Sequence, residues 1–215
     1  MKCKVKKFLA AILAAIIAQS GSIVIVSAHN GDIHSGVYNS GAMCNQSNLN
    51  FKIDSSAQTS LLTYIVYNTA YAWSSTSTGV SVNVVMSSPG MPTYGFYNVY
   101  GLSYYDGTLG TTIPRDSSGN IVDMDSNWNS VSICICAADN VFADSTAAAK
   151  TFVHEVGHAL KLKHPISNYT LTDHIYLGGV PKAIMNQGLP SSSQPWIATS
   201  IQTHDIYNIT AKWGN

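Results

Sequence analysis

The chain carries little charge and is nearly free of glutamate. Only 10% of its 215 residues are charged, and 11 basic side chains balance 11 acidic ones. No cluster of basic residues occurs outside the extreme N-terminus, which argues against a nucleic-acid partner. Glu155 is the single glutamate of the sequence. A metal ligand or a base that has to be a glutamate can therefore only be this residue.

Cysteines are also few, and their spacing is neither that of a metal site nor that of a redox motif. The four are Cys3, Cys44, Cys134 and Cys136, with no Cys-x-x-Cys pattern. Cys134 and Cys136 alternate on an expected strand, so both point to one face and are poorly placed to bond each other. Two alternatives stay open: a bridge from Cys44 to one of them in an oxidising compartment, or three buried thiols.

No apolar stretch after residue 28 is long enough to span a bilayer. The first 28 residues are typical of a secretory signal peptide: lysines at positions 2, 4, 6 and 7, an apolar run Phe8–Ala18, and small residues up to Ala28. We expect cleavage after Ala28, which leaves a single domain, residues 29–215, outside the cell and free of the membrane. The alternative is an uncleaved anchor, but Gln19–Ser22 interrupts the apolar run.

Hydrophobic periodicity predicts helices packed on a sheet. Strands are expected at 49–54, 80–86, 96–105, 121–124 and 131–136; helices are expected from residue 55 or 56 to 73, from about Asp144 through the stretch described next, and over 203–213. Gly-, Asn- and Ser-rich residues 29–48 predict an irregular, mobile arm that carries His29 and His34. Asp106–Gly119 and most of the chain between Pro165 and Thr203 are expected to be loop.

The main chemical signal lies between residues 151 and 165. His154 and His158 are four residues apart, which places two imidazoles on one helix face, one turn from each other. Glu155 lies beside the first, so the motif offers two zinc ligands and a base for a water molecule. From this composition His-Glu-x-x-His is expected by chance roughly once in a thousand such chains. His164 follows, directly before Pro165.

This stretch resembles a known family. His154-Glu155-x-x-His158-x-x-Lys161-x-x-His164 is similar to the signature of metzincin zinc peptidases, which has glycine at the position of Lys161. Ala183–Gly188 resembles the Met-turn of that family, and Asp205–Gly214 resembles the last helix of its matrixin-like branch, in a secreted bacterial type. The resemblance covers roughly residues 49–215.

The resemblance implies an α/β layered fold with a twisted, mixed, mostly parallel sheet. Two long helices, a backing helix and an active-site helix, would pack on it within an N-terminal subdomain, residues 49–164. A smaller, loop-rich C-terminal subdomain, residues 165–215, would contain the Met-turn and end in a helix.

The resemblance also implies a role for each site residue. His154, His158 and His164 would hold one catalytic Zn²⁺ and leave a position open for water. Glu155 would be the general base, and Met185 an apolar floor under the metal. A protein or peptide substrate would lie extended along an edge strand of a monomeric enzyme.

Three features depart from the family. Glycine suits the left-handed turn that brings the third histidine to the metal, whereas a lysine at position 161 costs roughly 1 kcal/mol there. The inhibitory cysteine segment and the second zinc site of the matrixin-like branch are not visible. Pro165 helps the turn by moving His164 out of the helical region.

Other polar residues have competing interpretations. Asp173 and His174 are alternative third ligands, although their spacing does not fit the aspartate-ligand zinc peptidases. His204 and Asp205 are interpreted as N-terminal residues of the last helix. Calcium could bind at Asp106, Asp123 or Asp125, but no loop spacing demands a calcium site there.

Three functions fit these residues. The first is a secreted zinc endopeptidase. The second is a non-catalytic, zinc-containing binding module on the same fold, and the presence of Glu155 argues against it because a structural zinc needs no adjacent base. The third is a zinc hydrolase that acts on a non-peptide amide.

Overall fold

The computed structural model describes residues 33–37, 48–57, 60–76, 79–87, 97–102, 108–136, 145–165, 176–177, 180–189 and 197–214. Their centre is a five-stranded sheet of order β2-β1-β3-β5-β4. Neighbouring strands are parallel except β4, which is antiparallel to β5. The expectation of a mixed, mostly parallel sheet is therefore confirmed. The strand bounds are β1 Asn48–Ile53, β2 Ser81–Met86, β3 Tyr97–Leu102, β4 Gly110–Arg115 and β5 Ser130–Cys136.

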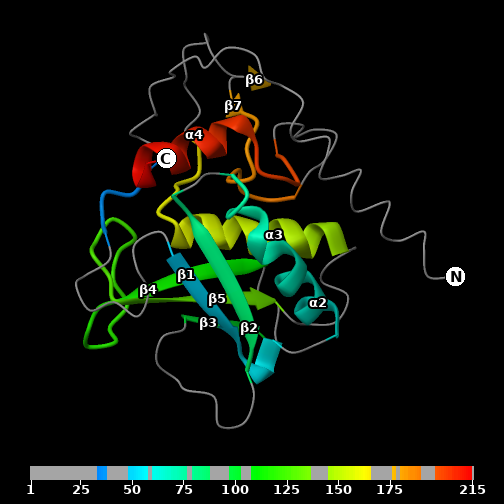
Figure 1. Ribbon diagram of the computed structural model, residues 1–215, viewed down its shortest axis with the longest axis vertical. Coiled ribbons are helices and arrows are strands. Elements are labelled where there is room, and N and C mark those ends of the chain that lie inside the picture. The colour runs from blue at the N-terminus through cyan, green and yellow to red at the C-terminus, as the bar shows by residue number, and fades with distance from the viewer. Residues whose placement is uncertain are drawn as a thin grey trace, which may run out of the picture.

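Helices α2 (Ser60–Thr69) and α3 (Ser145–Ala159) pack with the sheet (Figure 1). The apolar alternation of β1 buries Leu49, Phe51 and Ile53 completely. Trp73, fully buried beyond the end of α2, donates its indole N–H to the backbone oxygen of Val153 in α3 over 2.8 Å. Since a buried indole N–H needs a partner, this bond fixes α3 against the preceding helical segment.

The last helix, α4 (Thr203–Trp213), lies on the side of α3 that faces away from the sheet (Figure 1). Trp213 donates its indole N–H to the Leu160 oxygen at the end of α3, over 2.9 Å. Two short strands, β6 (Tyr176–Leu177) and β7 (Val180–Pro181), form a hairpin in the part of the chain expected to be loop. No described helix has the length and apolar character needed to cross a membrane.

The prediction of a loop over Asp106–Gly119 is wrong for Gly110–Arg115, which form strand β4. Threonines at 111 and 112 and Ile113 suit a pleated strand, but the flanking Gly and Ser residues conceal them in a composition window. Among the described residues β4 has β5 as its one neighbouring strand, and an edge strand needs fewer apolar residues than a central one.

Two other elements also differ from expectation. The predicted strand 121–124 is reduced to a bridge between Arg115 and Ile121. The predicted helix 55–73 is divided into a 3₁₀ turn at Ser55–Ala57, α2, and a second 3₁₀ turn at Ala70–Ala72.

Several predictions lie outside the described residues. These are the signal peptide, residues 29–32 with His29, and the residues Cys44, Asp106, Asp173 and His174. Cys134 and Cys136 are buried on β5, and in the described part of the chain neither is in a disulfide. The division into subdomains 49–164 and 165–215 stays a prediction.

Candidate metal centre

Three imidazoles from α3 and the turn after it converge on one point. The Nε2 atoms of His154, His158 and His164 lie 3.0–3.1 Å from one another. Ligands about 2.0–2.1 Å from a tetrahedral zinc stand about 3.3 Å apart, so the three nitrogens are within a few tenths of an ångström of that arrangement. Among the described residues, this is the group of three that could hold a metal ion.

The second ring nitrogen of two of these histidines is held by the backbone. His154 Nδ1 is 2.9 Å from the Ile184 oxygen, and His158 Nδ1 is 2.8 Å from the Leu162 oxygen. Because a carbonyl only accepts, each Nδ1 carries the proton and each Nε2 keeps its lone pair for a metal.

Burial keeps the three rings neutral. It lowers the pKa of His158 to about 3, and it lowers the pKa values of His154 and His164 below their ordinary range. Neutral imidazoles with converging lone pairs are the donor set that zinc takes from histidine.

The turn that delivers His164 has the left-handed residue expected at position 161. Lys161 has φ 72°, and it is the one non-glycine residue with positive φ in the described chain. Its N–H donates to the His158 oxygen over 2.8 Å, and the Leu162 N–H donates to the Gly157 oxygen over 3.0 Å. These two bonds form a Schellman motif, which usually has glycine at this position.

The Lys161 side chain is fully buried, and its contacts explain why a lysine stands at a position that favours glycine. Its ammonium lies 3.2 Å from the centroid of the Trp128 ring, and it donates to the Ser126 oxygen over 3.1 Å and to the Met124 oxygen over 3.4 Å. Burial lowers the pKa of Lys161 to about 7. The side chain thus ties the ligand-bearing turn to the segment before β5.

Glu155 lies next to the imidazoles and is itself 5% exposed. Its Oε2 is 2.7 Å from the Thr112 hydroxyl, whose single proton is shared with the Glu155 backbone oxygen at 2.8 Å. Burial raises the pKa of Glu155 to about 7, while the Thr112 hydroxyl and the Lys150 ammonium act in the opposite direction. A carboxyl group with a pKa near neutrality can both take and return a proton at physiological pH.

The predicted Met-turn passes beneath this helix. Met185 is 2% exposed, and a Cβ added at Gly157 would lie 2.3 Å from its sulfur. Gly157 is therefore required by close packing rather than by its backbone conformation. Asp205, at the N-terminus of α4 as expected, accepts N–H groups of Ile184 and Met185 at 2.9 and 3.3 Å, which anchors the turn.

An open cavity of about 710 Å³ lies over the imidazoles. Its wall contains Glu155, the three histidines and the part of β4 that begins at Gly110; Lys150, Lys163 and His34 also line it. Four of the lining residues were not expected at the site: Thr112, Lys150, Lys163 and His34. The helical spacing of Lys150, four residues before His154, was a signal that could have placed it there.

His34 reaches the cavity because residues 33–37 are fixed to the body of the protein. Ile33 forms a bridge with Leu162, and the His34 N–H donates to the Lys161 oxygen over 2.8 Å. The expectation of a mobile arm is thus wrong for these five residues.

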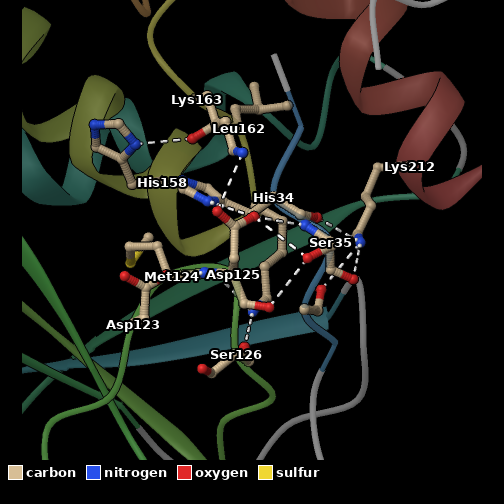
Figure 2. Close-up of polar contacts among 12 residues, drawn as sticks. His34, Ser35, Asp123, Met124, Asp125, Ser126, His158, Leu162, Lys163 and Lys212 are labelled. Carbon is tan, nitrogen blue, oxygen red and sulfur yellow. Dashed lines mark hydrogen bonds and ion pairs between the residues drawn. The ribbon is translucent and has the colours of Figure 1, made fainter. Parts of the chain in front are cut away.

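Two charged side chains from distant parts of the chain, Asp125 and Lys212, hold residues 33–37 in place. Figure 2 shows Asp125 among its partners: its carboxylate accepts the Ser35 N–H over 2.9 Å and lies 3.2 Å from His34 Nδ1 and 3.1 Å from Lys163 Nζ. These groups hold the pKa of Asp125 well below its usual range, with the Ser35 N–H as the main cause. Lys212 donates to the His34 oxygen over 2.8 Å.

Comparisons with known proteins found distant structural similarity and no family. No family model matches the chain, and no curated protein matches it. Two solved structures of myroilysin are similar in shape. One is 14% identical, with a TM-score of 0.48, 91% of this chain and 98% of that chain covered; the other is 13% identical, with a TM-score of 0.45 and coverages of 90% and 99%. Similarity at this level does not assign a family, so the candidate function rests on the geometry of the site.

Proposed function

We propose that the protein is a secreted zinc-dependent endopeptidase, and that His154, His158 and His164 hold the zinc. The observation that carries this proposal is the convergence of three neutral Nε2 atoms, 3.0–3.1 Å apart, on a cavity that also contains Glu155. A structural zinc site is closed by four protein ligands, whereas among the described residues three face an open cavity.

When bound, the zinc would polarise the scissile carbonyl and make a water molecule more acidic. Glu155 takes the proton of the attacking water and passes it to the departing amine. The Thr112 hydroxyl, 2.7 Å from Oε2, orients the carboxylate for both transfers. Met185 keeps the floor beneath the histidines apolar and excludes water from that side.

The substrate chain would be held by the edge of the sheet. In the described part of the molecule β5 is the one strand that neighbours β4, and the bridge with Ile121 lies at the Arg115 end of β4, away from the Gly110–Thr112 part that lines the cavity. An extended peptide can add to such an edge through main-chain hydrogen bonds. This supports a peptide as the substrate over a small non-peptide amide.

Metal analysis together with a peptide-library digest tests the proposal. We expect one zinc per chain and cleavage that stops when a chelator removes the metal and resumes when zinc is returned. Stoichiometric zinc without cleavage of any peptide would contradict it and favour a non-catalytic binding module.

A further inference from the structure

Lys150 is a buried lysine that neither the metal site nor the proton transfer uses. It is 2% exposed, and it lies on α3 one turn before His154, so that Lys150, His154 and His158 follow one another along the same helix face. The cavity lining includes Lys150 together with Gln187 and Gly188, the last two residues of the Met-turn. The lysine therefore faces the end of the cavity next to the reacting atoms.

The ammonium of Lys150 is incompletely satisfied by the described residues. It donates to the Asn186 oxygen over 2.7 Å. Its other near neighbour is His154 Nδ1 at 3.4 Å, which cannot accept because its proton is committed to the Ile184 oxygen. No carboxylate of the described chain lies within ion-pair distance of it, as the two ion pairs found both involve Asp125. An ammonium has three N–H donors, so at least one is left without an acceptor among the described residues.

Burying a cation without a counter-ion is costly, and apolar residues of similar size serve packing better. The cavity wall adds a second argument. Of its two lysines, Lys163 is paired with Asp125, whereas Lys150 has no carboxylate within ion-pair distance among the described residues. A buried, unpaired cation at the wall of a recessed site attracts an anionic group of a ligand.

We propose that Lys150 is a specificity residue that binds a substrate carboxylate beside the scissile bond. The inference rests on the proposed peptidase function and deepens it by naming the substrate class: peptides with a carboxylate one or two residues from the cleaved bond. Four helical residues separate Lys150 from His154, about 6 Å along the axis, which an extended peptide covers in about two residues. The carboxylate is that of an aspartate or glutamate side chain, or that of the free C-terminus of a short peptide.

The test measures kcat/KM for matched peptides that differ in one group. A library peptide that the enzyme cleaves is remade with Glu or with Gln at each of the two positions on either side of the scissile bond. A second series ends one or two residues after the scissile bond, with either a free or an amidated C-terminus. A charge-assisted hydrogen bond of the usual strength gives a preference of about ten- to a hundredfold for the carboxylate. Preference for Glu identifies a side chain as the source, and preference for the free terminus identifies the chain end.

The variant Lys150→Gln keeps a donor for the Asn186 oxygen but loses the charge, and we expect it to abolish the preference. The ratio of two substrates on one enzyme is insensitive to lost zinc, which lowers both rates equally. Lys182→Gln, at an exposed lysine outside the cavity lining, is the matched control and should keep the wild-type ratio. Lys150→Arg should keep the preference in part.

The outcomes separate this inference from the proposed function. If wild type cleaves Glu and Gln peptides, free or amidated, with equal efficiency, Lys150 holds the Met-turn only and the inference is wrong, while the peptidase stands. The same conclusion follows if Lys150→Gln keeps the wild-type ratio. Failure of zinc-loaded wild type to cleave any peptide overturns the proposed function and this inference with it.

Discussion

Replacing Lys161 with glycine should destabilise the protein, although glycine is the residue that its backbone conformation favours. The change relieves left-handed strain of about 1 kcal/mol. It also removes four fully buried methylenes, worth about 0.8 kcal/mol each, or about 3 kcal/mol together. The ammonium's contacts with Trp128 and two carbonyls are offset by the cost of burying the charge, so their net contribution is about zero. We therefore expect a loss of about 2 kcal/mol.

Urea unfolding of the zinc-free protein measures this loss, because bound zinc would add its own binding free energy. Lys161→Met is the matched variant: it keeps the apolar stem and the strained backbone, and it should lie within about 1 kcal/mol of wild type. If Lys161→Gly is as stable as wild type or more stable, the strain outweighs the side chain, and the explanation of a lysine at this turn is wrong.

Three further changes test other parts of the structure. Gly157→Ala should lower the melting temperature, because overpacking against Met185 and Trp73 costs about 1–3 kcal/mol and exceeds the gain of about 1 kcal/mol in helix propensity; a higher melting temperature would contradict the close approach. Asp125→Ala should speed hydrogen exchange in a peptide spanning residues 33–37, and unchanged exchange would mean that Asp125 does not hold this segment. The pKa of Lys161 is lowered from 10.5 to about 7, so the native state binds fewer protons than the unfolded state between these pH values. Stability should therefore rise with pH across that window in wild type, and it should rise less in Lys161→Met when unfolding is measured at pH 7 and pH 10.

Local pattern was sufficient for much of the framework. The strands near 49, 80 and 131 and the last helix at 203–213 lie where periodicity placed them, to within a residue or two. Spacing alone put His154 and His158 on one helix face, and the likeness of the motif to a known signature pointed to His164 and to a left-handed residue at 161. These features depend on neighbours within a few residues, which a sequence displays directly.

Features that depend on distant partners were not predictable in this way. β4 is a strand because β5 pairs with it, and its own threonines and glycines do not distinguish it from a loop. His34 reaches the cavity through contacts with Asp125 and Lys161, about 90 and 130 residues further along the chain. The position of the Lys161 ammonium likewise depends on Trp128, which no local pattern links to the turn.

The central claim is that Glu155 transfers the proton at a zinc site built by three histidines. The most direct measurement is kcat of Glu155→Gln on a peptide that wild type cleaves, with zinc content determined on the same samples. The substituted amide preserves the shape of the side chain and can still contact Thr112, but it cannot accept a proton. We therefore expect one zinc per chain and a fall in kcat of about 10²–10⁴-fold. Zinc-loaded Glu155→Gln that cleaves the peptide at the wild-type rate would contradict the account.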